Sequence, residues 1–393
     1  MKGLVLEGGG AKGAFHCGAV KALYDYGYTF DGVAGTSIGA INGALIAQEC
    51  GYEKMYDVWT SVTASDITHF DNIEVNKLFN REFSRETVAY WGKQVLKIIS
   101  NLGVPTDKIS DFLRKIIDED KLRSSPMDYG IVTYCLSNRE PLELFKEDIP
   151  VGELHNFILA SAYFPAFRLG RMNGKYYIDG GVYDNLPLNA LPEQKNYDEI
   201  YAIRTMSRMP HKEIRRRDVT VHYICPSEEL GNTVNINQRA INYKIKLGYY
   251  DALRFIKGYK GFRYYINGDA DFFDKVFYSL NDETKDQICN LYRIKQENFF
   301  TELSEKLKPQ TNDEIGISNI NSFFSFFEDI AIFYGVEKFS IYTQKEFIDE
   351  LLRKSVSIDT ENTAIKYRRF SSIAKKLALY QILIPYIMEI RRG

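Results

Sequence analysis

The sequence predicts an α/β fold with a mainly parallel central sheet between helical layers, followed by a mostly helical C-terminal region. Over the first 50 residues, short apolar runs alternate with runs whose apolar side chains recur at helical spacing. Beyond Gly261 this alternation stops, and the apolar residues keep mainly a helical period. We therefore expect two domains, residues 1–260 and residues 261–393.

The N-terminal elements are expected in the order strand, helix, strand, helix. Short apolar runs at Gly3–Leu6 and Phe30–Ala34 predict strands. Helical spacing of the apolar residues predicts helices at Ala11–Tyr26 and Ile38–Gln48. A strand–loop–helix unit that repeats in this way predicts a parallel sheet with helical cover.

Further along the chain the pattern is less regular. Residues 52–121 are helical in pattern, and Asn173-Gly174 predicts a tight hairpin turn. The charged stretch 211–218 is expected to be a solvated loop. The other expected elements are strands at Tyr129–Leu136, Glu140–Phe145, Glu199–Met206 and Val219–Cys225, and helices at Val151–Ala162 and Asn237–Tyr259.

The composition is that of an ordinary globular protein, with 45% hydrophobic and 26% charged residues among 393. A formal net charge of −2 lacks the basic surplus of a general nucleic-acid binder. The five cysteines are scattered without a Cys-x-x-Cys pair, which predicts neither a disulfide framework nor a zinc cluster. We therefore expect a reducing compartment, the cytoplasm, and no nucleic-acid partner.

Nothing in the sequence predicts a membrane span. The chain passes from its first residues directly into the first expected strand, so no signal peptide is expected. The longest apolar stretch, Leu377–Ile390, is too short for a hydrocarbon core of about 30 Å and contains Gln381 and Pro385. The high aromatic content, with 28 Tyr and 25 Phe, leaves a peripheral association with a membrane surface open.

A glycine-rich loop follows the first expected strand. Gly8, Gly10 and Gly13 match the G-x-G-x-x-G fingerprint of dinucleotide-binding enzymes, so an NAD(P)-binding oxidoreductase is one alternative. That fold needs an acidic residue at the end of the second strand to hold the ribose. Asp31 has about the right spacing but precedes the apolar part of that strand. A P-loop is excluded because Ala14 stands where its lysine would be.

A candidate nucleophile follows the second expected strand. Gly35-Thr36-Ser37-Ile38-Gly39 fits G-x-S-x-G, the sharp strand-to-helix turn that exposes a catalytic serine. Glycine is expected at positions 35 and 39 because side chains there would collide with the neighbouring strand or helix. The helix that follows would direct its positive N-terminal end at charge developing beside Ser37.

A serine nucleophile needs a base, and the histidines are poor candidates. They occupy expected helices, a strand, a polar segment and the charged loop: His16, His69, His155, His211 and His222. Among them, His16 lies near the glycine loop and stays a secondary candidate. The better candidate is Asp179, which ends an apolar strand and precedes the tight turn Gly180-Gly181. An ordinary Asp-Gly hairpin turn is the alternative.

Three motifs in this order resemble the signature of the patatin-like phospholipases, a family of lipid acyl hydrolases. They are Gly8-Gly9-Gly10-Ala11-Lys12-Gly13, Gly35-Thr36-Ser37-Ile38-Gly39 and Asp179-Gly180-Gly181. Three shorter segments also resemble parts of that family: Ala160–Pro165, Asp184–Pro187 and Pro226–Gly231. The resemblance covers roughly residues 3–260.

The resemblance implies a patatin-like fold and hydrolysis of an acyl ester, from a phospholipid or another lipid, without metal or organic cofactor. It implies Ser37 as nucleophile and Asp179 as the base, which would also protonate the leaving alcohol and later activate a water. The implied oxyanion hole consists of the backbone N–H groups of Gly8, Gly9, Gly10 and Ala11. Lys12, Gly13, Gly35, Gly39, Gly180 and Gly181 support the motifs, with no role assigned to Lys12.

Two alternatives remain open from the sequence. A patatin-like fold could be a catalytically silent lipid-binding or regulatory module, although the presence of both Ser37 and Asp179 favours an enzyme. The aromatic stretch Asn321–Gly335 could form a membrane-docking surface. A helical lobe packed on the hydrolase domain is favoured, because aromatic side chains are usually buried.

Overall fold

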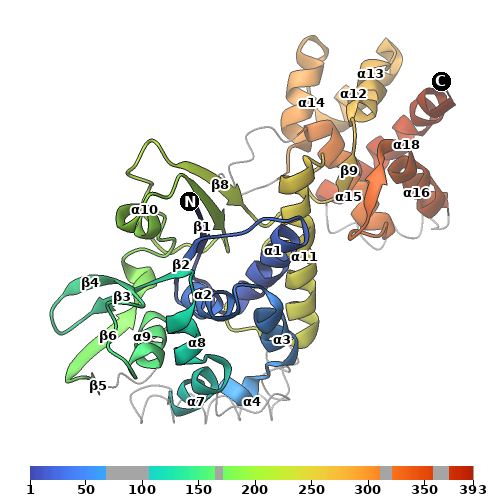
Figure 1. Ribbon diagram of the computed structural model, residues 1–393. Coiled ribbons are helices and arrows are strands. Elements are labelled where there is room, and N and C mark those ends of the chain that lie inside the picture. Colours follow the sequence, from blue (N-terminus) through green and yellow to red (C-terminus); the bar gives the residue numbers. More distant parts are fainter. Residues whose placement is uncertain (68–105, 164–170, 310–320, 357–370, 393) are drawn as a thin grey trace, which may run out of the picture. The chain divides into compact units, whose positions relative to one another are not determined.

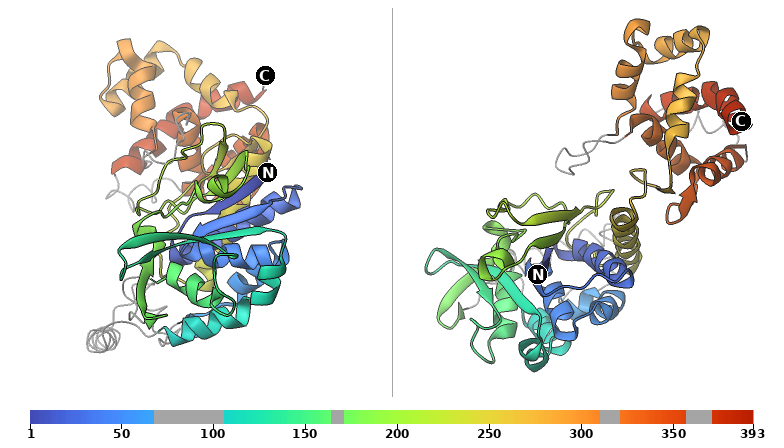
Figure 2. Two further views of the ribbon diagram at one scale, coloured as in Figure 1. Left: turned by 60° about the vertical axis from the view of Figure 1, so that its left-hand side comes forward. Right: turned by 45° about the horizontal axis from the view of Figure 1, so that its top comes forward.

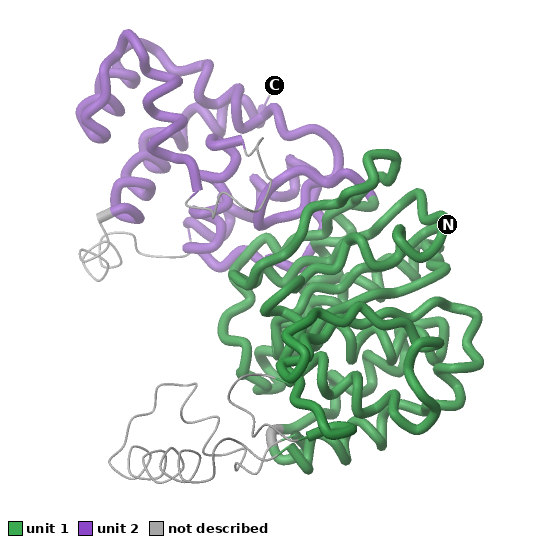
Figure 3. The backbone as a smooth tube through the Cα atoms, turned by 90° about the vertical axis from the view of Figure 1, so that its left-hand side faces the viewer, with its two compact units in different colours: residues 1–256 green, residues 257–393 purple. Residues whose placement is uncertain are grey.

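The computed structural model describes residues 1–67, 106–163, 171–309, 321–356 and 371–392. The chain divides into two compact units, residues 1–256 and residues 257–393, which we call the first and the second unit (Figure 3). Three sets of residues considered above lie outside the described part: His69, the middle of the expected helical stretch 52–121, and residues 164 and 165.

An eight-stranded sheet forms the centre of the first unit (Figure 1). Its strands are β1 (Lys2–Leu6), β2 (Gly32–Thr36), β3 (Asp128–Cys135), β4 (Glu140–Phe145), β5 (Arg171–Met172), β6 (Lys175–Asp179), β7 (Glu199–Ile203) and β8 (Thr220–Ile224). They are ordered β5-β6-β3-β2-β1-β7-β8, and β4 also pairs with β3. The pairs β3–β2, β2–β1, β1–β7 and β7–β8 are parallel, whereas β4, β5 and β6 add antiparallel pairs. The predicted α/β class is confirmed.

Helices cover both faces of this sheet (Figures 1 and 2). They are α1 (Ala14–Asp25), α2 (Ile38–Glu49), α3 (Glu53–Ser61), α4 (Ala64–Ile67), α7 (Asp107–Ile116), α8 (Glu119–Ser124), α9 (Leu154–Ser161), α10 (Ala190–Gln194) and α11 (Gln238–Lys257). On one face, Val5 and Ala34 belong to a buried cluster with Leu191 of α10. On the other face, Gly35 of β2 lies against the backbone of α2. The result is the expected arrangement of three layers.

Helices α1 and α11 cross at backbone contact. A Cβ atom on Gly18 would lie 1.8 Å from the carbonyl oxygen of Ile245, and one on Gly248 would lie 2.1 Å from that of Phe15. Real Cβ atoms do not approach backbone so closely, so only glycine permits this crossing. The middle of α11 is therefore fixed against α1, which begins directly after the glycine loop.

The second unit is mostly helical, with α12 (Asp271–Tyr278), α13 (Asp282–Tyr292), α14 (Phe299–Leu307), α15 (Ser322–Tyr334), α16 (Gln344–Val356) and α18 (Ser371–Arg392). It also contains a parallel strand pair that was not expected, β9 (Tyr265–Asn267) with β10 (Ile341–Thr343). Each strand has three residues, which is too short to give a period, and the two are far apart in sequence.

Aromatic side chains build the core of the second unit. The rings of Phe273 and Phe324 stack at 4.1 Å, and those of Phe277 and Phe323 stack at 4.2 Å. All four side chains are buried, so the aromatic stretch around α15 faces its own core. No helix within the described residues is long and apolar enough to cross a bilayer.

Candidate active site

The glycine loop and Ser37 lie side by side at one edge of the sheet. The loop follows β1, Ser37 follows β2, and the register of these parallel neighbours places Leu6 beside Gly35. Loops at the carboxyl ends of adjacent parallel strands meet at the same edge. A Cβ atom on Gly8 would lie 3.2 Å from the Cβ atom of Ser37, so the two segments touch.

Asp179 reaches Ser37 from the far side of β3. Thr36 of β2 pairs with Val132 of β3, and the next residue of β3, Thr133, pairs with Asp179 of β6. Ser37 and Asp179 therefore flank the same position of β3. Ser37 lies beside the Asp179 carboxylate and acts to lower its pKa. The structure thus brings together the two residues that sequence motifs far apart in the chain had suggested.

The backbone at Ser37 has the conformation of a tight elbow. Ser37 has φ 57° and ψ −125°, a combination that is costly for a residue with a Cβ atom. A Cβ atom on Gly35 would lie 2.3 Å from the backbone of Gly39, and one on Gly39 would lie 2.1 Å from the carbonyl oxygen of Leu6. The glycines are therefore required by close packing, as expected. The Ser37 N–H donates to Oγ of the buried Ser161 on α9 at 3.0 Å.

Burial makes Asp179 a stronger base than an ordinary aspartate. Burial raises its pKa to about 6, although the Gly181 N–H and Ser37 both favour the ionised form. The Gly181 N–H donates to Oδ1 at 2.8 Å. Near neutral pH the carboxylate is therefore ionised, and its proton affinity is well above that of a solvated aspartate.

The backbone N–H groups of the glycine loop are not equally available. The Gly8 N–H donates to the carbonyl oxygen of Asn185 at 3.0 Å, and the Ala11 N–H donates to that of Thr233 at 2.6 Å. The described hydrogen bonds include none from the N–H groups of Gly9 and Gly10. Of the four expected oxyanion donors, the part of the chain that the structure describes thus leaves the N–H groups of Gly9 and Gly10 available.

Buried polar groups beside β1 hold the start of the glycine loop. Glu7 is fully buried, forms an ion pair with Arg204 at 3.0 Å and accepts the Thr205 N–H at 2.6 Å. The Thr205 hydroxyl donates to the carbonyl oxygen of Gly8 at 2.6 Å. Lys12 Nζ lies 3.5 Å from the carbonyl oxygen of Thr205, and burial lowers its pKa. Lys12 therefore contacts the support of the loop.

Several residues of this support were not identified from the sequence as site residues. Asn185 lies against Gly8 with its side-chain amide, which donates to Gly8 O at 3.3 Å, and the Thr36 hydroxyl donates to Asp184 O at 2.8 Å. Asp184 and Asn185 belong to the segment Asp184–Pro187, whose resemblance to the patatin-like family could have identified them from the sequence. Thr205 and Thr233 had no such signal, because both lie in irregular segments far from the motifs.

The described histidines lie elsewhere. His16 is fully buried, its Nδ1 lies 3.2 Å from the side-chain amide of Asn42, and burial lowers its pKa to about 3. His155 contacts the carbonyl oxygen of Ile117, His222 packs on the ring of Tyr201, and His211 is exposed. Among the residues that the structure describes, none of these four hydrogen-bonds to Ser37 or Asp179.

The geometry disfavours a dinucleotide at the glycine loop. Asp31, the candidate for holding a ribose, immediately precedes β2 and exchanges hydrogen bonds with Lys2 at the start of β1. It therefore lies at the edge of the sheet opposite to the loop. Strands of five residues separate the two edges by roughly 16 Å.

A comparison with protein families distinguishes the patatin-like interpretation of the motifs from the dinucleotide-binding one. The family model for patatin-like phospholipases matches residues 4–192, a range that includes the glycine loop, Ser37 and Asp179. Residues 4–192 form a patatin-like phospholipase domain.

Curated relatives of this patatin-like domain are fungal lysophospholipases. The chain is 52% identical over 54 residues to lysophospholipase nte1 of Aspergillus terreus, which is 14% of this chain and 4% of that protein. It is 27% identical over 200 residues to lysophospholipase NTE1 of Kluyveromyces lactis, covering 49% of this chain and 12% of that protein. The match to the Saccharomyces cerevisiae protein is also 27%, over 202 residues, or 48% and 10%. The chain thus spans at most 12% of the length of these three relatives.

Two solved structures also match the chain that carries the patatin-like domain. VipD from Legionella pneumophila is 15% identical with a TM-score of 0.39, and the match covers 100% of this chain and 91% of that one. The ExoU–SpcU complex from the type III secretion system of Pseudomonas aeruginosa gives 16% identity and a TM-score of 0.32, covering 97% and 75%.

Proposed function

We propose that this protein is a lipid acyl hydrolase that cleaves carboxylic ester bonds through an acyl-Ser37 intermediate. The observation that carries the proposal is the placement of Ser37, on a strained elbow, beside the buried Asp179 carboxylate within a patatin-like domain. We assign the activity to a hydrolase domain of residues 1–260, with residues 261–393 as a helical accessory region.

In the acylation step, Asp179 accepts the proton of the Ser37 hydroxyl while Oγ attacks the ester carbonyl carbon. The carbonyl oxygen becomes an oxyanion, which the Gly9 and Gly10 N–H groups stabilise together with the positive end of α2. The carbon–oxygen bond to the alcohol then breaks, and Asp179 returns the proton to the departing alkoxide. The acyl group remains on Ser37.

In the deacylation step, Asp179 removes a proton from a water, and the resulting hydroxide attacks the acyl carbon. The second oxyanion occupies the same two donors and collapses with release of the carboxylic acid from Ser37, whose oxygen recovers the proton from Asp179. One residue can act first as base and then as acid because its raised pKa, about 6, lies close to neutral pH.

The proposed substrate is a phospholipid or another acyl-ester lipid. The names of the curated relatives, all lysophospholipases, support this class. We further propose that the enzyme meets its substrate at a membrane surface as a peripheral protein of the cytoplasm. Sedimentation of the full chain in the presence and absence of phospholipid vesicles tests membrane binding separately from ester hydrolysis.

A fluorophosphonate probe and a Ser37→Ala variant test the chemistry. We expect the probe to label the full chain on Ser37, and we expect Ser37→Ala to abolish labelling and lower ester hydrolysis by at least about 10⁴-fold, because the covalent route is lost. Labelling that survives the substitution would identify a different nucleophile. A folded protein that neither reacts with the probe nor hydrolyses short-chain or lipid esters would favour the silent-module alternative.

A further inference from the structure

Lys244 of α11 contacts the glycine loop from outside the three motifs. It is 4% exposed, and its Nζ donates to the carbonyl oxygens of Ala11 at 3.2 Å and Asn235 at 3.3 Å. A buried ammonium needs such acceptors, because it loses its hydration on folding. Lys244 therefore joins the glycine loop to the segment 232–237.

The segment 232–237 also forms a direct hydrogen bond with Ala11 of the glycine loop. The Ala11 N–H donates to Thr233 O, while the Ala11 carbonyl accepts from Lys244, so both polar groups of Ala11 are fixed. Gly10, with φ +55°, packs so closely that a Cβ atom would lie 2.3 Å from Thr233 O. The Ala11 N–H shares a planar peptide unit with the Gly10 carbonyl, so its bond to Thr233 also fixes that carbonyl. With the unit after Gly10 held and Gly10 itself packed against Thr233, the preceding N–H groups have less freedom to turn.

The position of Lys244 is itself fixed by the crossing of α1 and α11. Ile245, the next residue, has its carbonyl oxygen against Gly18, and Gly248 one turn later lies against Phe15. A shift of α11 along or away from α1 would break these backbone contacts. The ammonium of Lys244 is thus held at a set distance from a loop that leads directly into α1.

We propose that Lys244 is a positioning residue for the oxyanion hole: by fixing the Ala11 carbonyl, it directs the Gly9 and Gly10 N–H groups toward the ester oxygen. The proposal rests on the proposed function, and Lys244 itself need not touch the substrate. Burial and the charge of Lys12 lower the pKa of Lys244 to about 8.

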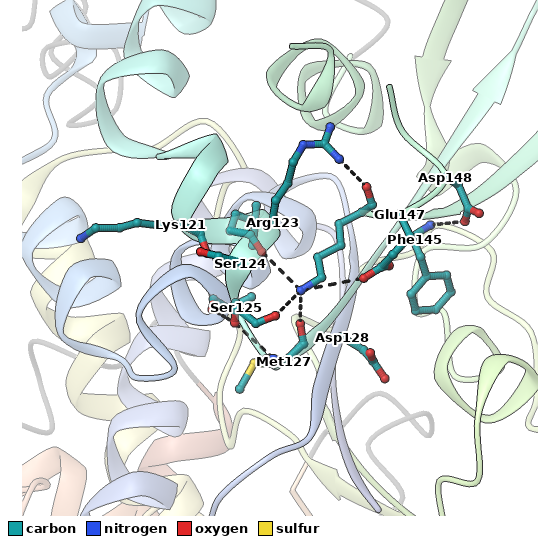
Figure 4. A network of polar contacts seen from close by, with 12 residues as sticks. Lys121, Arg123, Ser124, Ser125, Met127, Asp128, Phe145, Glu147 and Asp148 are labelled. Atoms are coloured by element: carbon teal, nitrogen blue, oxygen red, sulfur yellow. Dashed lines mark hydrogen bonds and ion pairs between the residues drawn. The ribbon is translucent and has the colours of Figure 1, made fainter. Parts of the chain in front are cut away.

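A second buried lysine provides a matched control for a purely structural role. Lys146 is also 4% exposed, and its Nζ donates to the carbonyl oxygens of Leu122, Ser125 and Met127, in the network of Figure 4. Met127 and Asp128 lie at the amino end of β3, since Asp128 pairs with Gly32 at the start of β2. Lys146 therefore satisfies carbonyl groups at the edge of the sheet opposite to the glycine loop.

The test compares Lys244→Met with Lys146→Met and with Lys246→Met, which changes an exposed lysine of the same helix. Active sites of each full-length variant are first titrated with the fluorophosphonate probe. The kcat per titrated site is then measured with a short-chain ester, together with Ki for a trifluoromethyl ketone, which forms an oxyanion on the serine.

For Lys244→Met we expect a kcat per site lower by about 10- to 100-fold, with KM changed by less than about threefold, because misplacement of donors affects the transition state. Ki of the ketone should rise by a similar factor. Lys146→Met should lower the unfolding temperature without changing either value per site, and Lys246→Met should change neither stability nor kinetics.

Unchanged kcat and Ki per titrated site in Lys244→Met would overturn the proposal, even if fewer sites were active, because a structural role reduces only the active fraction. Lys244→Gln is measured in the same way, so the result does not depend on the folding of one variant. A wild-type chain without probe labelling, or labelling that survives Ser37→Ala, would instead refute the proposed function.

Discussion

Buried charged groups at the proposed site of the first unit serve a different purpose from a buried charged group of the second unit. In the first unit, Glu7, Asp179 and Lys244 all contact the glycine loop, its support or the elbow serine. In the second unit, one oxygen of the buried Glu328 accepts the N–H groups of residues 262–264 at 2.8 Å each, next to Gly261 with φ +98°. There the carboxylate fixes a turn of the chain within its own unit.

The packing of the two units differs as well. Glycines in the first unit allow backbone segments to touch around the proposed site, whereas the second unit fills its core with stacked aromatic rings. Close backbone contact positions polar groups, and aromatic packing stabilises a fold. Substitutions at the proposed site should therefore change activity more than stability, and substitutions in the aromatic core should do the reverse.

Among the variants that compare the two units, Asp179→Asn is expected to have the largest effect on activity. Loss of the base should lower kcat/KM by about 10²- to 10⁴-fold. In the wild type, kcat/KM should rise with pH and level off above an apparent pKa near 6, because only the ionised carboxylate accepts the Ser37 proton. Rates of a short-chain ester between pH 5 and pH 9 measure both effects. Unchanged turnover in the variant would exclude Asp179 as the base.

The same variant should be more stable than the wild type at high pH. The folded-state pKa of Asp179 lies above its ordinary value of 3.8, so the folded state binds the proton more tightly and its stability falls as pH rises from about 4 to 6. Above pH 7, replacing the buried carboxylate with an amide should raise the unfolding free energy by roughly 1–3 kcal/mol. Urea unfolding at pH 5 and pH 8 measures the difference.

Gly10→Ala should have the next largest effect. Its Cβ atom would meet the Thr233 carbonyl oxygen, at a backbone φ that disfavours alanine, so the loop must move. We expect kcat per titrated site to fall by about 10²- to 10³-fold, the usual cost of losing an oxyanion donor. Gly27→Ala is the control, because that glycine also has positive φ but open space around it. Equal activity of both variants would contradict the assignment of this loop.

Phe324→Ala should have the smallest effect on turnover. Removing a buried ring that stacks on Phe273 should lower the unfolding free energy of the second unit by about 3–5 kcal/mol. The kcat per titrated site on a short-chain ester should stay within about twofold of the wild type. Differential scanning calorimetry and site titration measure the two quantities. A loss of kcat per site comparable to that of Gly10→Ala would show that the comparison of the two units is wrong.

The sequence was sufficient for most of the fold because its signals are local. β4 has the predicted bounds, Glu140–Phe145, and the hairpin turns at Asn173-Gly174 as predicted. The first helix differs: the expected Ala11–Tyr26 begins with a 3₁₀ turn, Gly10–Gly13, and the α-helix starts at Ala14. Within that turn the Ala11 N–H donates to the carbonyl oxygen of Thr233, a contact that no local pattern contains.

For the proposed site, the sequence identified the residues of the motifs but not their support. Ser37 and Asp179 stand out because the glycines around them are a local steric requirement. Thr233 and Lys244 are distant in sequence, and each looks ordinary: a polar loop residue and a lysine on an amphipathic helix. Only the packing of α11 on α1 brings Lys244 to the loop, so its contribution could not be read from spacing.

The glycine crossing of α1 and α11 also has a consequence for protein engineering. Gly18 and Gly248 both lie in helix interiors, where a search for stabilising substitutions would replace glycine with alanine to gain about 1 kcal/mol in helix propensity. Here the added methyl groups would meet backbone atoms at 1.8 and 2.1 Å and push the helices apart. A mutational library for this chain should leave both positions unchanged, although each is remote from Ser37 in sequence.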